Sequence, residues 1–299
     1  MCTAISFSTK DHYFGRNLDL EYSYDESVTI TPRNYPFHFR HCSSISSHYS
    51  MIGMAYIYDD YPLYYEATNE KGLSMAGLNF PGNAVYKPFA SDKDNVAPFE
   101  FIPWILCQCE SLPEVSALLD RLNLVHEDFC PQLPLTPLHW IISDKDDSLV
   151  VESTHEGLNI YPDPLGILTN NPPFEQQMVN YNLFKDAILP GDLSSESRFV
   201  RAAFVKELSV CGSSESESVN QFFHLLGSVE YQKGRVRTEN DLPKFTIYSS
   251  CCNTSKGIYY YKTYNNSQIC AVNIHHEDLN AKHLTSYSLT KSSQFDWHN

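Results

Sequence analysis

The chain has 299 residues, 42% of them hydrophobic and 19% charged, and can therefore bury a sizeable core as one large domain or two ordinary ones. Its net charge of −15 at pH 7 argues against nucleic acid or an anionic membrane surface as the main partner. No stretch reaches the roughly eighteen consecutive apolar residues that span a membrane. No repeat or shift in composition marks a boundary, so we predict a single domain over residues 1–299.

Strand patterns come first along the chain and a helical pattern follows them. Alternating, β-branched and aromatic residues predict strands at 4–8, 27–33, 50–68 and 72–80. Apolar residues at helical spacing then predict helices within 98–123, and Ser111 followed by Pro113 indicates where the second of them begins.

The second half of the chain repeats this order. Residues 138–172 predict three strands, separated by an Asp-rich turn and a Gly turn. A helix pair is predicted over 197–208 and 216–226, with a short polar loop at 213–218, and 244–275 predicts three more strands. Strands and helices in alternating blocks predict an α+β fold in which two antiparallel sheets pack together with helices outside.

The opening, MCTAISF, places a cysteine directly behind the initiator methionine. If Met1 is removed, Cys2 carries a thiol and a free α-amine, with ordinary pKa values of about 8.5 and about 8, so one residue can supply nucleophile and base. If the first strand pairs with YFGRNLDL, then Arg16 returns beside Cys2 to favour its thiolate and Asp19 returns to anchor the amine. The alternative is a buried strand with a structural Arg–Asp salt bridge.

The same opening lacks a basic start followed by an apolar run, so we predict a cytoplasmic protein with reduced cysteines. The nine cysteines are irregularly spaced. The candidates for a metal or redox site are Cys107, Cys109, Cys251-Cys252 and His275-His276, and none shows paired CxxC spacing. We predict no metal and no cofactor.

Seven separated motifs resemble those of one known family and follow its order over nearly the whole chain. They are MCTAISF, YFGRNLDLEYS, NEKGLSMAGLNFPG, TPLHWIISD, LTNNPPF, SRFVRAAF and GIYYYKTY. On these motifs the chain is identified as a member of the choloylglycine hydrolase family, which holds conjugated bile salt hydrolases and penicillin V acylases among the N-terminal nucleophile (Ntn) hydrolases. The resemblance implies a four-layer αββα fold and hydrolysis of an unstrained amide.

The resemblance also implies roles for particular residues. Cys2 matches the nucleophile, and Arg16 and Asp19 match residues that flank it. Asn79 matches a position whose backbone N–H contributes to the oxyanion hole, the group of donors that stabilises the charged oxygen of the tetrahedral intermediate. Asn170, directly after Thr169, matches the side-chain donor to the same hole. Arg198 matches an arginine close to the nucleophile.

The same resemblance favours bile salts as substrates, because Asn79 in GLNFPG is the residue that bile salt hydrolases carry where penicillin V acylases tend to have Tyr. The loop EDFCPQLPLTPLHW resembles one that covers a sterol. An apolar wall is therefore predicted from Leu18, Leu20, Tyr58, Phe129, Leu133 and Leu138. The products are expected to be free bile acid and glycine or taurine. Penicillin V or another N-acyl amide is the alternative substrate, and a catalytically inactive binding protein is a further alternative.

One departure from the family pattern concerns assembly. The family usually has a long excursion before PGD that helps to build a tetramer, whereas here only Leu183–Leu189 intervenes before Pro190. We predict a homo-oligomer for which a tetramer is in doubt: a dimer or monomer, or a tetramer held by other contacts.

Overall fold

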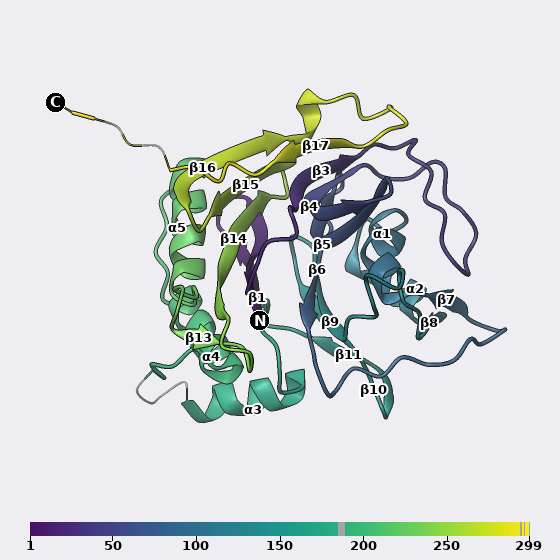
Figure 1. The fold of residues 1–299 in the computed structure, drawn as a ribbon, viewed down its shortest axis with the longest axis horizontal. Coiled ribbons are helices and arrows are strands. Elements are labelled where there is room, and N and C mark those ends of the chain that lie inside the picture. The colour runs from purple at the N-terminus through teal and green to yellow at the C-terminus, as the bar shows by residue number, and fades with distance from the viewer. Residues whose placement is uncertain (185–188, 294, 296, 299) are drawn as a thin grey trace.

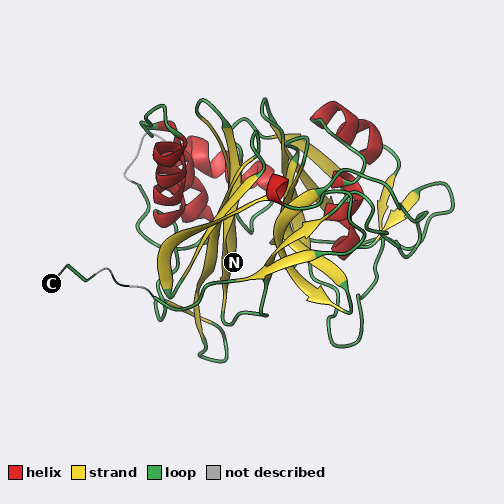
Figure 2. Cartoon of the chain, turned by 90° about the horizontal axis from the view of Figure 1, so that it is seen from above, coloured by secondary structure: helices red, strands yellow, loops and turns green. Residues whose placement is uncertain are grey.

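The computed structural model describes residues 1–184, 189–293, 295 and 297–298. Within these residues the two large sheets lie face to face, and helices cover the outer face of each sheet (Figures 1 and 2). The predicted α+β class and the αββα layering are confirmed. The N-terminus lies in the middle of the molecule, between the two sheets (Figure 2).

The first sheet contains the start of the chain and has the order β12-β1-β2-β14-β15-β16, with β13 paired to β14. Its strands are β1 (Cys2–Ser8), β2 (His12–Leu20), β12 (Ile167–Leu168), β13 (Val236–Arg237), β14 (Pro243–Asn253), β15 (Ile258–Thr263) and β16 (Asn266–Asn273). The first strand of the chain therefore has neighbours on both sides.

The second sheet has the order β11-β10-β9-β6-β5-β4-β3-β17. Its strands are β3 (Ser27–Thr31), β4 (Met51–Tyr58), β5 (Tyr61–Asn69), β6 (Ser74–Asn79), β9 (Leu138–Ser143), β10 (Ser148–Thr154), β11 (Gly157–Pro162) and β17 (Thr285–Ser288). A small parallel pair, β7 (Asp94–Val96) and β8 (Leu122–Leu124), lies beyond it.

The helices differ from the prediction mainly at their ends. They are η1 (Pro98–Glu100), α1 (Phe101–Leu106), α2 (Leu112–Leu119), α3 (Phe174–Phe184), α4 (Ser195–Glu207), α5 (Glu215–Gly227) and η2 (Ile274–His276). The helical prediction over 98–123 was too long, because β8 begins at Leu122. The predicted polar loop at 213–218 was wrong in part, because the Ser214 side chain accepts a hydrogen bond from Glu217 N–H and starts α5.

Two apolar clusters hold the layers together. One lies between the sheets and extends outward to α4 and α5, with Phe14, Ile141 and Phe222 fully buried in it. The other packs α1 and α2 against the second sheet around Trp140 and Phe101, whose rings meet edge to face at 4.9 Å. Among the described residues, no helix is both long and apolar enough to cross a membrane.

Candidate active site

The β1–β2 hairpin explains why Arg16 and Asp19, both in the motif GRNLD, lie on opposite faces of the sheet. Cys2 pairs with Leu18, and Ala4 pairs with Arg16. Because side chains alternate along a strand, Arg16 and Leu18 share one face of the sheet with Cys2, while Asp19 lies on the other. The first face is directed toward the second sheet, and the other toward α4 and α5.

Arg16 occupies a gap where two strands of the second sheet separate. The β5–β6 pairing ends at Glu66 and Ala76, so the next carbonyls, of Tyr65 and Gly77, are not joined across the ladder. Arg16 Nη1 donates to both of them, at 3.0 Å to Tyr65 O and 2.6 Å to Gly77 O. The guanidinium is thereby fixed on the face of the sheet that carries the Cys2 side chain.

A buried acidic group faces Arg16 from behind. Glu66 Oε2 lies 3.9 Å from Arg16 Nε, and the carboxylate accepts hydrogen bonds from the hydroxyls of Tyr248 and Tyr259. Burial alone would lower the pKa of Arg16, but the neighbouring Cys2, Tyr248 and Glu66 more than offset this effect and raise it. Arg16 is therefore a permanent buried cation next to the Cys2 thiol.

The backbone N–H of Asn79 points toward the same gap. Phe80 N–H donates to Pro137 O across the β6–β9 ladder at 2.7 Å, which makes Phe80 and Pro137 a hydrogen-bonded pair. In an antiparallel ladder such pairs alternate with pairs that do not exchange hydrogen bonds. The next pair, Asn79 and Leu138, is of the second kind, so Asn79 N–H is directed away from β9 and toward β5.

The Asn170 side chain is oriented by contacts on both of its polar atoms. Its Oδ1 accepts from Cys2 N–H at 2.7 Å and from Arg198 Nη2 at 2.9 Å. Its Nδ2 donates to Asn79 O at 2.8 Å. Since an amide nitrogen carries two hydrogens, one N–H of Asn170 remains for a further acceptor near Cys2 and Asn79.

Arg198 reaches this site from α4 and is itself fully buried. Its Nη1 donates to Cys2 O at 2.5 Å and to Thr3 Oγ1 at 2.7 Å, and its guanidinium lies over the Tyr231 ring. Arg198 therefore holds the start of β1 and Asn170 in one arrangement.

Asp19 lies behind the first residues of the chain. Its backbone N–H donates to Met1 O at 2.9 Å, and its carbonyl accepts from the terminal amine of Met1 at 2.7 Å. Asp19 Oδ1 accepts from Thr246 Oγ1, whereas Oδ2 is buried without a hydrogen-bond partner among the described residues. Burial raises the pKa of Asp19 and lowers that of the Met1 amine.

A cavity of about 610 Å³ opens beside Cys2, Arg16 and Asn79. This volume falls within the range of pockets that hold small organic molecules. Away from those three residues the wall is largely apolar and aromatic, and includes Pro98, Phe99, Ile102, Pro134, Leu135, Pro137 and Trp140. The cavity therefore combines a polar end at Cys2, Arg16 and Asn79 with a largely apolar body.

The predicted apolar wall lies at this cavity, with one exception. The residues that line it are Leu18, Leu20, Phe129, Leu133 and Leu138. Tyr58 does not line it, because its ring packs edge-on behind Phe129 at 5.6 Å. Arg40 supports the same loop, donating to Phe129 O at 2.7 Å.

Sequence reasoning missed several lining residues. Part of the wall is aromatic surface from Tyr22, Tyr24, Tyr56 and Tyr65. Gly77 also lines the cavity and, having no side chain, leaves space there. The available signal was the segment EYSY, which directly follows LDL and contains Tyr22 and Tyr24. Two tyrosines just past the buried part of a strand lie where its end meets the cavity. Their hydroxyls hydrogen-bond to each other at 3.0 Å.

The cysteines considered for a metal site belong to the cores. Cys107 and Cys109 are buried in the cluster against α1, and Cys251 and Cys252 are buried next to each other in β14. Burial raises the pKa of Cys109 and Cys252 to about 12. The described residues contain no cluster of three or more histidine, cysteine or acidic side chains placed to hold a metal ion.

The αββα layers, with a cysteine at the start of the first strand beside a cavity, define the class of Ntn hydrolases. A family model described as linear amide C-N hydrolases, choloylglycine hydrolase family, matches residues 2–188 and 186–287. The chain belongs to this family, and it is an amide hydrolase. The family prediction is confirmed.

Individual relatives agree with this assignment. The chain is 50% identical to a bile salt hydrolase/transferase of Lactiplantibacillus plantarum, over 99% of each chain. It matches the crystal structure of the C2A variant of conjugated bile acid hydrolase from Clostridium perfringens with a TM-score of 0.93 and 35% identity, over 100% of each chain. Penicillin V acylase from Agrobacterium tumefaciens shares the fold, with a TM-score of 0.81 and 17% identity, over 96% of this chain and 90% of that one.

Proposed function

We propose that this chain hydrolyses the amide bond of glycine- or taurine-conjugated bile salts, with Cys2 as the nucleophile after Met1 is removed. One observation carries the proposal: Cys2, Arg16 and Asn79 meet at the polar end of a largely apolar and aromatic cavity of about 610 Å³. A conjugated bile salt has the matching shape, a large rigid apolar body joined to an amide. The relatives named above as acting on bile salts support the same substrate class.

Acylation begins at the Cys2 sulfur. The thiol proton passes to the α-amine, and the thiolate, favoured by Arg16, attacks the amide carbonyl carbon. The carbonyl oxygen becomes an oxyanion and accepts hydrogen bonds from Asn79 N–H and Asn170 Nδ2. The intermediate then collapses: the C–N bond breaks, the leaving amine takes the proton from the α-ammonium, and a thioester on Cys2 remains.

Deacylation reverses the proton path with water as the nucleophile. The α-amine takes a proton from water, the hydroxide attacks the thioester, and the C–S bond breaks to release bile acid and restore the thiol. When Met1 is present, the Cys2 nitrogen is an amide that donates to Asn170 Oδ1 at 2.7 Å. Removal of Met1 turns this nitrogen into an amine, for which we propose Asp19 Oδ2, buried without a hydrogen-bond partner among the described residues, as an acceptor.

The substrate class is tested by initial rates measured side by side on taurocholate, glycocholate and phenoxymethylpenicillin. We expect kcat/KM to be at least about 100-fold higher for the bile salts, because an extra apolar ring system buried at about 25 cal/mol per Å² adds several kcal/mol. A preference for phenoxymethylpenicillin would contradict the proposed substrate and leave the amide hydrolase assignment intact.

We further propose a cytoplasmic location, and a dimer or monomer, or a tetramer held by contacts outside the short segment. Part of that segment, residues 185–188, lies outside the described residues. Multi-angle light scattering at low protein concentration tests the assembly. A stable tetramer that persists on dilution would contradict the smaller assembly.

A further inference from the structure

A buried histidine–carboxylate pair contacts the neighbours of both predicted oxyanion donors. His139 on β9 and Glu152 on β10 are both fully buried, and His139 Nδ1 lies 2.9 Å from Glu152 Oε1. On its other side, His139 Nε2 lies 2.9 Å from the carbonyl oxygen of Thr169. The residue after Thr169 is Asn170, so this contact fixes the backbone that carries the oxyanion side chain.

The same imidazole also contacts the segment of the other oxyanion donor. The rings of His139 and Phe80 are stacked, with centroids 4.2 Å apart and planes 6° from parallel. Phe80 directly follows Asn79. One buried ring therefore touches the immediate neighbours of both Asn79 and Asn170, although these residues are far apart in the sequence.

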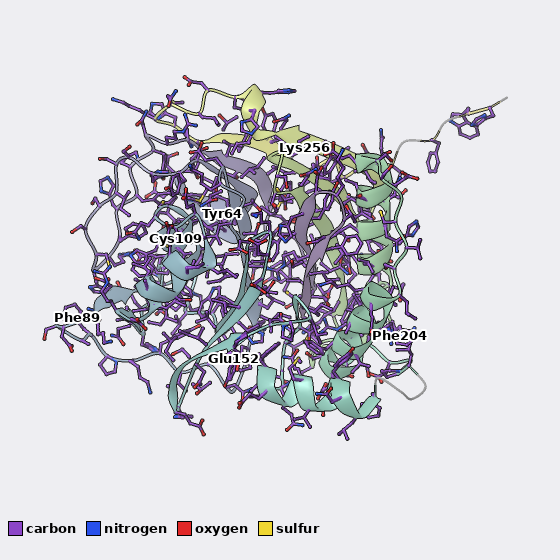
Figure 3. The ribbon with its side chains drawn as sticks, turned by 180° about the vertical axis from the view of Figure 1, so that it is seen from behind. Tyr64, Phe89, Cys109, Glu152, Phe204 and Lys256 are labelled. Carbon is purple, nitrogen blue, oxygen red and sulfur yellow. The ribbon has the colours of Figure 1, made fainter. Side chains whose placement is uncertain are left out.

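Glu152 extends the support to the helix that follows Asn170. Its Oε1 accepts from Phe174 N–H at 3.0 Å, at the start of α3, and Figure 3 shows Glu152 next to this helix. Gln177 on the same helix donates to Asn170 O at 2.6 Å. The Glu152 carboxylate thus joins His139, which contacts Thr169 O, to α3, which contacts Asn170 O through Gln177.

The hydrogen bonds determine how many protons the pair carries. A backbone carbonyl only accepts, so His139 Nε2 must carry a hydrogen toward Thr169 O. The contact between His139 Nδ1 and Glu152 needs a second hydrogen, since neither a bare ring nitrogen nor a carboxylate oxygen can donate. A neutral imidazole has one N–H only, so the pair holds one proton more than a neutral histidine beside a carboxylate.

We propose that His139 and Glu152 are positioning residues that hold Asn79 and Asn170 in the geometry that stabilises the oxyanion, through this shared proton. The role rests on the proposed function of Asn79 and Asn170. The arrangement is destabilising in one respect, because Glu152 Oε2 is buried with no hydrogen-bond partner among the described residues. Preorganised donors lower the barrier only if their positions are held before the reaction, which is what the pair does.

The test uses the variants Glu152→Gln and His139→Phe, with His12→Gln as a matched control. Glutamine keeps the shape of Glu152 but removes its charge, and beside a neutral His139 the amide atom at this position can either donate to Nδ1 or accept from Phe174 N–H, but not both. Phenylalanine keeps the stack on Phe80 but has no N–H. His12 is an equally buried histidine, at the far end of β2, bonded to Ser6 and Thr254.

For Glu152→Gln and His139→Phe we expect kcat to fall about 10- to 100-fold and KM to change less than about twofold, because the apolar cavity is untouched. His12→Gln should change kcat less than twofold when all proteins are assayed well below their melting temperatures. Rates are taken on whichever of the three substrates the parent cleaves. A folded Glu152→Gln or His139→Phe enzyme with parental kcat would overturn the role.

A second readout needs no turnover and separates this proposal from the bile salt assignment. In ¹H–¹⁵N spectra of the imidazole region, the parent should show two His139 signals, one for the Nε2 hydrogen toward Thr169 and one for the proton shared between Nδ1 and Glu152. The Glu152→Gln variant should lose the signal of the shared proton. A parent spectrum with a single ring N–H for His139 and a bare Glu152 carboxylate would refute the proton arrangement, whatever the substrate.

Discussion

The two ends of the cavity are built in different ways. At the polar end, the residues come from β1, β2, β6, α4 and the chain just after β12. The side chains of Arg16, Asn170 and Arg198 are each fixed by several hydrogen bonds, as in the contacts of Arg198 with Cys2 O, Thr3 and Asn170. At the apolar end, the wall comes mainly from strand ends and the 126–137 loop, which is held by Arg40 and by aromatic contacts such as Phe99 with Phe129. The predicted catalytic residues thus lie mostly on strands of the two sheets, whereas much of the apolar wall lies on a loop.

This difference has a consequence for kinetics. Interactions that strengthen only in the transition state change kcat, whereas contacts made equally by substrate and transition state change KM. Substitutions at the polar end should therefore lower kcat, and substitutions at the apolar end should raise KM. Each variant below tests whether that separation holds.

The largest effect is expected for Arg16→Met. Removing the cation beside the Cys2 sulfur should lower kcat by a factor on the order of 10³ and slow alkylation of Cys2 by iodoacetamide. It also leaves Glu66 as an unpaired buried carboxylate, which costs about 3–5 kcal/mol of stability. The double variant Arg16→Met/Glu66→Gln should recover stability and leave kcat low. Recovery of kcat in the double variant would show that Arg16 acts on stability alone.

Asn170→Ala should lower kcat about 100-fold, because it removes one donor to the oxyanion. The neighbouring residue provides the control. Asn171 donates from Nδ2 to Pro81 O, and within the part of the chain that the structure describes its side chain forms no hydrogen bond with Cys2 or Arg198. Asn171→Ala should keep kcat within about threefold of the parent. Equal losses in the two variants would contradict the separate role of Asn170.

At the apolar end, Phe129→Ala should raise KM about tenfold, because loss of its contact with a buried substrate body costs about 1.5 kcal/mol. Its kcat should stay within about twofold. Tyr58→Phe serves as the control, since Tyr58 packs behind Phe129 and does not line the cavity. A fall in kcat without a change in KM would show that the loop takes part in the chemistry.

The last prediction concerns stability, with no expected effect on catalysis, and lies far from both ends of the cavity. Burial lowers the pKa of His12 to about 4, from an ordinary value of 6.5. Between these two values the unfolded chain binds the proton more readily than the folded one, so acid favours unfolding. Between pH 7 and pH 5 His12 should remove about 2 kcal/mol of stability. Urea unfolding at both pH values should show this loss in the parent and a correspondingly smaller loss in His12→Gln.

Sequence patterns predicted much of the fold, because alternation and turn residues are local signals. The hairpin that returns Arg16 beside Cys2 and the strands broken at 255–257 are examples. α3 was missed because FEQQMVNYNLF has few apolar residues at helical spacing and only Phe174 and Gln177 are buried in it. The predicted end of the helices within 98–123 was wrong because Leu122 pairs with Asp94, and a local pattern does not show pairing between residues so far apart in the sequence.

For the site, family motifs located residues that the structure brings together, but they gave no account of what holds them. The gap between β5 and β6 and the buried pair behind Asn170 depend on contacts between strands that no spacing in the sequence encodes. Tyr58 was predicted for the apolar wall together with the loop residues, but it is not among the residues that line the cavity, and its ring packs against Phe129 instead. The single-domain prediction over 1–299 stays a prediction.

The central claim is that catalysis uses the sulfur and the free amine of one residue, Cys2. It is tested most directly by intact-mass and peptide mass spectrometry of active enzyme after brief exposure to taurocholate and, separately, to iodoacetamide. The account predicts a chain that lacks Met1, with the cholyl thioester and the carbamidomethyl group both on the peptide that begins with Cys2. Active enzyme that retains Met1, or an acyl group found on another residue, would contradict it.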